Sequence, residues 1–512
     1  MMSYDVVVYG ATPSGITAAL AVQREGRSVV IVEPGRWLGG ILGAGIKPRQ
    51  DCPDVGAVGG WTLRCMDFEP HPAGVRKGFA AWLAGAGIEV IYEQRVIAVE
   101  REGTKIVSFR TEHASPDRWG IPPEKGNPAA GAEFRARVFI DASYEGDLMA
   151  QAGVSYSVGR ESHAQYGEQF AGVQPFTNVT PIDPYRTPGD PASGLVPLVE
   201  ADHGLPGGSA DDYTQAYNYR FYVTADPAAR VPFTPPDDYR PETYEVVGRY
   251  VEHLVASGRP ELIDRIFPGW LNEGEYNYYR ESLVTIAPLG VSRTFQDADY
   301  AVRSRLWRQH ADYLRGLHHF MSTDARVPAE IRARTAALGL ERWHHPETEG
   351  WPHQLYIRIA RRMNGPYVLT EANVRGKAGA PDSVGLGQYG VDTYPVRRVA
   401  VRIPDTNTMG VATEGNMWIG GAHGAGPYPI SYRAITPKAQ ECGNLLVPVS
   451  LSASYIAYAS VRMEPTFMVL GESAGVAAAL ALAQGSTVQD VGIDKLRARL
   501  REVGQKIDLP RS

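Results

Sequence analysis

The 512-residue chain has few cysteines and no excess of basic residues. Cys52, Cys65 and Cys442 form no CxxC pair and have no Cys/His ligand spacing, which excludes a disulfide scaffold and a structural zinc site. We therefore expect no metal centre. Fifty-one Lys and Arg residues stand against 57 Asp and Glu residues, and no basic stretch stands out that would neutralise a phosphate backbone. Nucleic acid is not an expected partner.

Long apolar runs are also absent. The longest, at residues 476–483, is far shorter than the roughly 20 residues that cross a bilayer. No charged segment or cleavage site precedes the first apolar run at Val6, and scarce cysteine suits a reducing compartment. The sequence predicts a cytoplasmic protein with no membrane partner, and it leaves a homo-oligomer open.

The N-terminal region has the pattern of a strand–helix–strand unit. Residues 4–9 read as a strand, 14–24 as an Ala-rich helix and 28–32 as a second strand ending at Glu33. Two alternating runs at 89–100 and 105–111 and a further strand at 134–142 follow. This arrangement predicts an α/β nucleotide-binding domain of the Rossmann type.

From about residue 155 the chain is rich in Tyr, Trp, His and Pro, until a helical pattern appears at 295–321, where His310 lies on an apolar stripe and is predicted as a core residue. Strand-like alternation resumes after Pro395, followed by an apolar strand at 444–449 and an Ala/Gly-rich helix at 465–483. We predict that a large α+β substrate or cap domain, 155–395, splits the nucleotide-binding domain into 1–154 and 396–512.

The turn between the first strand and helix has the position of a dinucleotide fingerprint. Gly10 allows the tight turn and Gly15 allows close helix–strand packing, while Thr12 replaces the middle glycine. Amides at the helix start would face a pyrophosphate. Glu33, 23 residues after Gly10, is placed to accept hydrogen bonds from a ribose with a free 2′-hydroxyl. A glycine turn in another kind of α/β protein remains the alternative.

Further segments carry a family resemblance. In chain order they are Leu38-Gly39-Gly40-Ile41-Leu42-Gly43, Asp141-Ala142-Ser143-Tyr144-Glu145-Gly146-Asp147, Trp351-Pro352-His353-Gln354, Asp382-Ser383-Val384-Gly385 and Val461-Arg462-Met463-Glu464-Pro465 with Gly471-Glu472-Ser473-Ala474-Gly475. Together with the turn, they resemble the bacterial FAD-dependent oxidoreductase family of the glutathione-reductase-like, two-dinucleotide-binding-motif flavoprotein superfamily. The resemblance runs from residue 4 to about 485.

The resemblance implies a glutathione-reductase-type fold and FAD as cofactor. It implies contacts between FAD and Gly10, Thr12, Pro13, Ser14, Gly15, Glu33, Pro34, Gly39, Gly40, Ile41, Val96, Ala142, Asp147, Arg462, Met463, Gly471 and Gly475. For Arg462 a structural ion pair is the alternative. The chain departs from the family at Trp37 and Tyr455, where members often carry His.

Flavin chemistry needs a base beside the C–H bond that is oxidised. His353 is the first choice for this base, and His423 is the second. Tyr455 is a possible proton donor or an ordinary buried tyrosine. Arg358 shares the spacing i, i+3 and i+4 with Arg361 and Arg362, which predicts one helix face that either binds a carboxylate or is simply solvated.

These features predict an enzyme that removes a hydride from a CH–OH, CH–NH or CH–CH group of a small polar substrate. No second nucleotide-binding unit is visible in the sequence, so the electron acceptor is expected to be O2, a quinone or a carrier protein. A flavin-dependent monooxygenase that uses an external reductant and O2 is the alternative within flavoenzymes. A flavin-storing protein without turnover is the alternative outside them.

Overall fold

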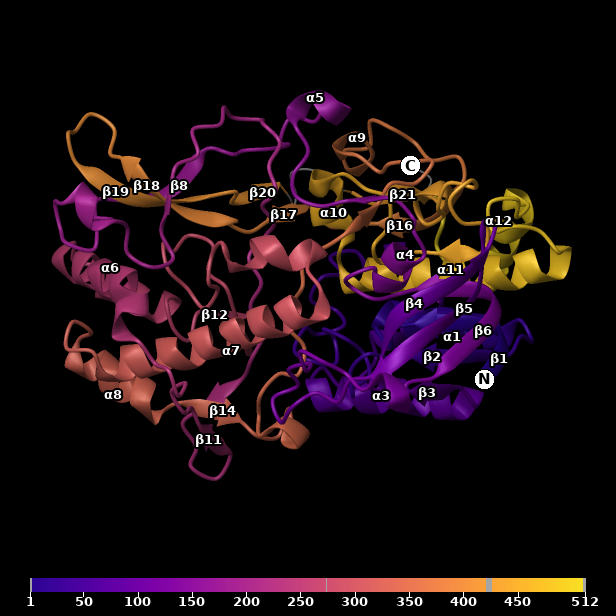
Figure 1. The fold of residues 1–512 in the computed structure, drawn as a ribbon, viewed down its shortest axis with the longest axis horizontal. Coiled ribbons are helices and arrows are strands. Elements are labelled where there is room, and N and C mark those ends of the chain that lie inside the picture. The colour runs from indigo at the N-terminus through magenta and orange to yellow at the C-terminus, as the bar shows by residue number, and fades with distance from the viewer. Residues whose placement is uncertain (1, 273, 420–425, 510–512) are drawn as a thin grey trace.

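A computed structural model describes residues 2–272, 274–419 and 426–509, and its ribbon forms two lobes (Figure 1). The first lobe is built on a seven-stranded sheet with the order β3-β2-β1-β6-β5-β4, in which β22 pairs with Phe139 and Ile140 near the end of β6. The pairs among β3, β2, β1, β6 and β22 are parallel, and β4 and β5 are antiparallel. The strands are β1 (Met2–Tyr9), β2 (Val29–Val32), β3 (Glu89–Ile91), β4 (Gln94–Glu102), β5 (Lys105–His113), β6 (Glu133–Asp141) and β22 (Leu445–Leu446).

The predicted strand–helix–strand unit is confirmed as β1, α1 (Pro13–Arg24) and β2. Val6, Val7 and Val8 are fully buried, because a central parallel strand is covered on both faces. Helix α1 begins where Thr12 caps it and Pro13 occupies its first turn, and it ends at Arg24. Residues expected to form strands at 89–100, 105–111 and 134–142 do so in β3 to β6.

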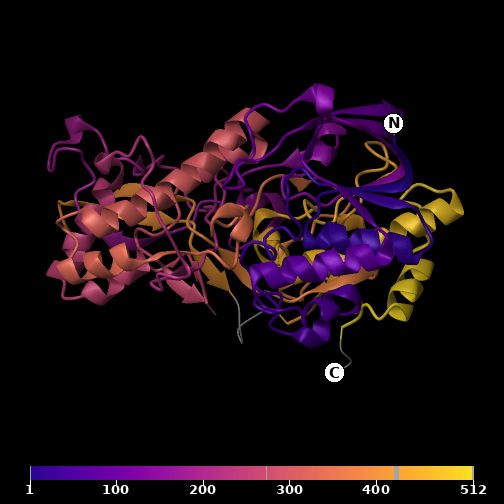
Figure 2. The same cartoon turned by 90° about the horizontal axis from the view of Figure 1, so that it is seen from below.

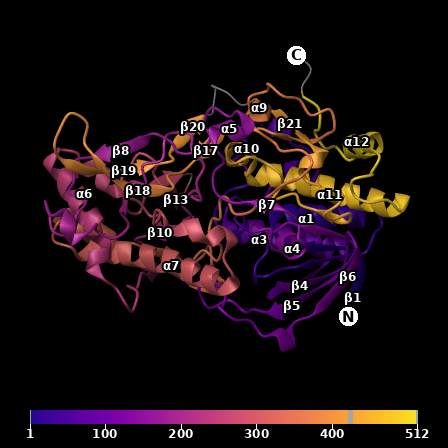
Figure 3. The ribbon, with the colours of Figure 1, turned by 45° about the horizontal axis from the view of Figure 1, so that its top comes forward.

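Helix α11 (Glu464–Gln484) packs against α1, as Figure 3 shows. Among the described residues it is the one helix long and apolar enough to cross a membrane, but 89% of its apolar window is buried inside the protein. A core helix has the same length and composition. The remaining helices of this lobe include α2 (Gly60–Cys65), α3 (Pro72–Ala86), α4 (Asp147–Gln151), α10 (Tyr455–Val461) and α12 (Ile493–Glu502).

The second lobe contains a four-stranded sheet with the order β8-β19-β18-β9 and three helices beside it (Figures 1 and 2). Its elements are β8 (Phe176–Thr180), β9 (Glu200–Ala201), β18 (Arg397–Arg402), β19 (Met409–Glu414), α6 (Glu245–Ala256), α7 (Tyr300–Thr323) and α8 (Ala329–Ala337). Asp299 caps α7, which therefore begins later than the predicted residue 295. His310 on α7 is buried, which confirms its prediction as a core residue.

Smaller sheets fill the remainder of the second lobe and the junction. β12 (Trp270–Asn272) pairs with β13 (Glu275–Asn277), β14 (Gly339–Glu341) pairs with β10 (Val223–Thr224) and β11 (Arg230–Pro232), β16 (Ser383–Gly387) pairs with β21 (Tyr428–Ser431), and β17 (Val391–Thr393) pairs with β20 (Met417–Ile419). β16 packs on α11, whereas the later strands β18 and β19 belong to the second lobe. The chain therefore passes between the lobes more often than one insertion at 155–395 requires, and the division at 154 and 395 stays a prediction.

The helix expected at Arg358, Arg361 and Arg362 is wrong. Residues 356–361 have no helical hydrogen bonding, and β15 (Arg362–Met363) pairs with β7 (Tyr156–Ser157). The three arginines are each buried and each bonded to a different partner, so their spacing reflects separate internal contacts and not one solvated or ligand-binding face.

Candidate functional site

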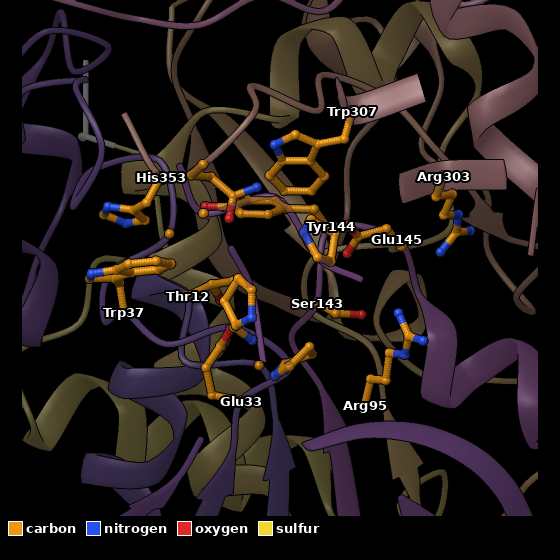
Figure 4. Close-up of a pocket in the computed structure, with 18 of the residues that line it drawn as sticks. Thr12, Glu33, Trp37, Arg95, Ser143, Tyr144, Glu145, Arg303, Trp307 and His353 are labelled. Carbon is orange, nitrogen blue, oxygen red and sulfur yellow. The ribbon is translucent and has the colours of Figure 1, made fainter. Parts of the chain in front are cut away.

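A first cavity lies where the parallel strands β1, β2 and β6 end. Gly10 follows β1, Glu33 follows β2 and Ser143 follows β6, and all three line the cavity. Figure 4 shows Thr12 and Glu33 on one side of it and Trp307 of α7 on the other. The carboxyl edge of a doubly wound sheet is the usual place for a nucleotide.

The glycine turn is shaped by close backbone contacts. Gly10 has φ +101°, and a Cβ on it would lie 3.0 Å from the backbone of Ala142. A Cβ on Gly15 would lie 1.9 Å from the carbonyl oxygen of Gly10. The Thr12 hydroxyl accepts from the N–H of Gly15 at 3.2 Å and donates to the carbonyl of Ala142 at 2.8 Å. Thr12 therefore caps α1 and ties the turn to β6, which explains a threonine in place of the middle glycine.

Glu33 braces the same turn from the end of β2. Its carboxylate accepts from the N–H of Ala11 and from the N–H of Gly35, each at 2.6 Å. Burial raises the pKa of Glu33 to about 7, against the opposing effect of these two N–H groups. Each carboxylate oxygen keeps a further acceptor position that suits a ribose hydroxyl. Pro34 lines the cavity beside it.

Asp147 also lines the first cavity, but its Oδ1 is held by two arginines. Arg303 and Arg361 each donate to this oxygen at 2.7 Å. Burial acts to raise the pKa of Asp147, and the two guanidinium groups outweigh it and hold the pKa below its ordinary value. Asp147 is therefore charged, with its other oxygen not engaged by either arginine.

The predicted glycine pair comes next to the start of α11. Gly39 and Gly40 have φ of +84° and +45°, and a Cβ on Gly40 would lie 2.3 Å from the hydroxyl of Tyr144. That hydroxyl accepts from the N–H of Ile41 at 3.0 Å and donates to Glu464 at 2.6 Å. Burial raises the pKa of Glu464 to about 8. Gly40 alone of the Gly39–Ile41 segment is among the residues that line the first cavity.

Several residues predicted to touch the cofactor make packing contacts within the protein and do not line the first cavity. The N–H and carbonyl of Val96 are bonded to the hydroxyls of Tyr9 and Tyr300, and its neighbour Arg95 lines the cavity. A Cβ on Gly471 would lie 2.1 Å from the carbonyl oxygen of Ser14, and one on Gly475 would lie 2.3 Å from that of Ala18.

Gly471 and Gly475 therefore let α1 and α11 cross closely, since small residues permit the two backbones to approach. Pro13, Ser14 and Gly15 are buried in the first turn of α1 at this contact, and the Ser14 hydroxyl has no hydrogen-bond partner in the described part of the chain. Ala142 is buried behind the turn, where its carbonyl accepts from Thr12.

A second cavity, of about 350 Å³, is lined by residues from both lobes. Arg462 and Met463, which precede α11, belong to its wall, as does Asp51. Five aromatic side chains complete the apolar part of the wall, Trp270, Tyr356, Tyr389, Tyr394 and Trp418. No local sequence motif predicts this cavity, because the residues that line it are scattered between positions 50 and 463 of the sequence.

Charged side chains in the second cavity are mostly paired. Arg220 donates to Glu275 at 2.6 Å, and Arg280 donates to Asp392. Arg462 donates to the Tyr356 hydroxyl at 2.8 Å and to the backbone carbonyl of Asp392 at 3.1 Å. The ion-pair alternative for Arg462 is thus present in a weak form, with 3.5 Å between its Nη2 and the Asp392 carboxylate.

The residue predicted as the base, His353, lines the first cavity. Its ring stacks on Trp37 with 4.7 Å between ring centroids and 19° between planes. Burial, and after it the charge of Arg76, lowers the pKa of His353 well below its ordinary value, so the imidazole is neutral at pH 7. His353 is not among the residues of the second cavity, and this placement gives no support to a role as base there.

The other predicted catalytic residues that the structure describes, Arg358 and Tyr455, line neither cavity. Arg358 is buried behind the second cavity, where it donates to Asn218 at 2.6 Å and lies over the rings of Tyr356 and Tyr394. It supports those rings and lines neither cavity. Tyr455 is buried and lines neither cavity, and its hydroxyl has no partner among residues 2–272, 274–419 and 426–509. His423 lies outside the described residues.

FAD fits these walls by the chemistry of its two ends. The first cavity offers a glycine cradle at the positive end of α1 for a pyrophosphate and Glu33 for a ribose. The second offers the N-terminus of α11 at Met463, where a partial positive charge favours an electron-rich ring system.

Comparisons with known proteins give one match over nearly the whole chain. A family described as FAD dependent oxidoreductase matches residues 5–500. Soluble pyridine nucleotide transhydrogenases of Mycobacterium bovis and Mycobacterium tuberculosis are 42% identical over 64 residues, which is 12% of this chain and 12% of each relative. The chain thus matches about an eighth of the length of these curated relatives.

Similar solved structures match about a third of the chain. The myxobacterial chondrochloren halogenase is 18% identical, with a TM-score of 0.22 over 31% of this chain and 41% of that one. The thioredoxin reductase of Streptococcus pyogenes is 21% identical, with a TM-score of 0.19 over 32% of this chain and 40% of that one.

Proposed function

This chain belongs to the FAD-dependent oxidoreductase family, with FAD as its cofactor, and on that premise we propose that it removes a hydride from a CH–OH, CH–NH or CH–CH group of a small polar substrate. One observation carries the proposal. Gly10, Thr12, Glu33 and Pro34, predicted for the nucleotide end of FAD, line the first cavity, whereas Arg462 and Met463, predicted for the flavin end, line the second. A polar substrate in the second cavity would therefore meet the flavin end of the site.

Bound FAD supplies a two-electron acceptor that takes a hydride at flavin N5. The chain's own residues hold it by complementary charge. Glu33 would accept hydrogen bonds from the ribose, Gly10 and Thr12 at the start of α1 would hold the pyrophosphate, and the start of α11 would stabilise negative charge on the flavin. Tyr144 and Glu464 keep α11 in register with the Gly39–Ile41 segment.

The second cavity supplies the selectivity for a polar substrate. Its paired arginines and acids are rigid, because Arg280 and Arg462 share Asp392, and Arg358 holds Tyr356 and Tyr394 from behind. Rigid polar groups orient a substrate without a large loss of side-chain entropy on binding. The oxidised carbon would thereby be held in a fixed orientation.

The proposal extends to the setting of the enzyme. We assign the electrons to O2, a quinone or a carrier protein, and the protein to the cytoplasm. The three cysteines are free and buried, which suits a reducing compartment, and α11 is a core helix.

An absorbance spectrum of the purified protein, followed by anaerobic titration with sugars, polyols, amino acids and aromatic alcohols, tests the proposal. Bleaching of the flavin band by one of these donors is expected. Consumption of NADPH with formation of a hydroxylated product would instead identify a monooxygenase. A flavin that dithionite reduces but no donor bleaches would contradict turnover.

A further inference from the structure

Asp51 is a buried carboxylate that has no hydrogen-bond partner in the part of the chain that the structure describes. Its side chain is 9% exposed, lines the second cavity and accepts no hydrogen bond from any described residue. Burial raises the pKa of Asp51 to about 6, and the charges of Arg220 and Arg462 oppose this rise. A buried carboxylate that lacks hydrogen bonds carries a desolvation cost, so its place in a cavity wall is explained if a ligand donates to it.

Of the two arginines that act on Asp51, Arg220 has a donor to spare. The Nε groups of Arg220 and Arg462 are buried and have no acceptor within the described residues, although Nη2 of Arg220 and both terminal nitrogens of Arg462 are bonded to Glu275, Tyr356 and Asp392. Those Nε groups are closed off from the cavity, whereas the Nη1 group of Arg220 is not buried and has no acceptor within the described residues. The cavity thus brings together an unfilled acceptor and one guanidinium group with a free donor.

Among common polar groups, a hydroxyl matches this combination best. It donates one hydrogen bond and accepts up to two, so a single hydroxyl or two neighbouring ones satisfy both Asp51 and an arginine. An ammonium group donates only, and an ionised carboxylate accepts only. The polar side of the cavity therefore selects a ligand with several hydroxyls.

The aromatic side of the cavity indicates the shape of that ligand. Trp270 and Trp418 are 40% and 44% exposed at this site, and Tyr389 contacts Trp418 with 5.4 Å between ring centroids. Trp418 on β20 lies directly opposite Asp392 on β17, so a flat apolar surface adjoins the charged groups. The electron-rich face of an indole attracts the weakly positive C–H face of a saturated ring.

We propose that the second cavity binds a carbohydrate, whose hydroxyls donate to Asp51 and accept from Arg220 while a sugar ring packs on Trp418. The carbohydrate site gives the substrate class for the proposed function. Carbohydrate binding does not depend on that function, whereas oxidation of the bound carbohydrate does. The cavity volume of about 350 Å³ lies within the range of small-ligand pockets.

Calorimetric titration of the FAD-bearing protein with D-glucose, D-galactose, D-glucuronate, N-acetyl-D-glucosamine and maltose tests the proposal. Benzyl alcohol and L-phenylalanine serve as ring-bearing comparisons without a sugar. At least one carbohydrate is expected to bind saturably. Asp51→Asn and Trp418→Ala should each weaken that binding about tenfold or more, since each removes one side of the site.

Trp343→Ala is the matched control, because Trp343 is 62% exposed and lies outside both cavities. It should leave carbohydrate affinity unchanged. If Asp51→Asn prevents folding, as judged by its flavin absorbance and melting temperature, Trp418→Ala decides the question, because Trp418 is exposed and its replacement removes little core packing.

Absence of binding by every carbohydrate would overturn the proposal, as would carbohydrate binding that neither Asp51→Asn nor Trp418→Ala weakens. The redox function fails separately. A carbohydrate that binds in the cavity and does not bleach the flavin anaerobically keeps the carbohydrate site and contradicts its oxidation. Bleaching by a donor that is not a carbohydrate, with no carbohydrate bound, keeps the redox function and contradicts the carbohydrate site.

Discussion

Tyr144 donates a 2.6 Å hydrogen bond to Glu464, which joins the loop after β6 to the first residue of α11. The same hydroxyl accepts from the N–H of Ile41, so three segments that are far apart in sequence meet at one phenol group. These segments lie between the residues of the first cavity and those of the second. The protonation state of Glu464 therefore affects how these three segments are held together at the cofactor site.

Glu464 gives the first prediction. Its folded pKa of about 8 lies above the ordinary 4.5, so the folded protein binds more protons than the unfolded one between these values. Stability from this group is complete below about pH 4.5 and is lost as pH rises toward 8. Glu464→Gln should flatten the fall of melting temperature between pH 5 and 8, because it removes a slope of up to about 1.4 kcal/mol per pH unit. Glu252→Gln, on the exposed face of α6, should leave the slope unchanged, and an equal slope in Glu464→Gln would contradict the assignment.

The helix crossing gives the second prediction. Gly471→Ala places a methyl group 2.1 Å from the Ser14 carbonyl, so α1 and α11 must separate, at a cost of about 3 kcal/mol. Gly85→Ala in α3 meets no atom within 4 Å and should raise stability by about 0.5–1 kcal/mol through helix propensity. Melting temperatures of the two variants are compared. An unchanged melting temperature in Gly471→Ala would disprove the close crossing.

Glu33 gives the third prediction. Glu33→Gln replaces one carboxylate oxygen by an NH2 group that faces the N–H of Ala11 or Gly35, so the turn loses one of two bonds. FAD affinity should fall about tenfold, measured by the flavin absorbance retained after gel filtration and by titration of the FAD-free protein. Glu89→Gln, on the exposed strand β3, is the control. Full retention of FAD by Glu33→Gln would contradict the proposed contact between Glu33 and the ribose.

His353 gives the fourth prediction. A base in proton transfer contributes about 10²–10⁴ in rate, whereas His353 packs on Trp37 in the first cavity. His353→Ala should lower FAD affinity and leave the anaerobic rate of flavin reduction, measured at saturating FAD, within about tenfold of the wild type. A loss beyond a hundredfold at full FAD occupancy would restore His353 as the base.

The residues at the nucleotide end of the site could be predicted from the sequence because they lie close together in it. Gly10, Thr12 and Glu33 lie on one strand–helix–strand unit, whose hydrogen bonds are fixed by short-range geometry. Gly471 and Gly475 were found by resemblance, but a glycine that admits a ligand and a glycine that admits another helix look alike in sequence. Their partner α1 lies more than 440 residues away.

The substrate half could not be read in the same way. Asp51 lies in a turn that has no hydrophobic periodicity. The charges that act on it come from Arg220 and Arg462, which are distant in sequence. The spacing of Arg358, Arg361 and Arg362 predicted a helix, but their partners Asn218, Asp147 and Glu161 hold them in extended chain. Charge spacing alone does not identify partners from another part of the chain.

Anaerobic stopped-flow reduction of the FAD-bearing protein, with Trp418→Ala and Trp343→Ala alongside the wild type, tests the central claim most directly. The donor is the one that bleaches the wild-type flavin in the substrate panel. The account predicts that the donor concentration for half-maximal reduction rate rises about tenfold in Trp418→Ala and stays the same in Trp343→Ala. Identical donor dependence in all three proteins would show that the donor reaches the flavin by another route, and would contradict a substrate site in the second cavity.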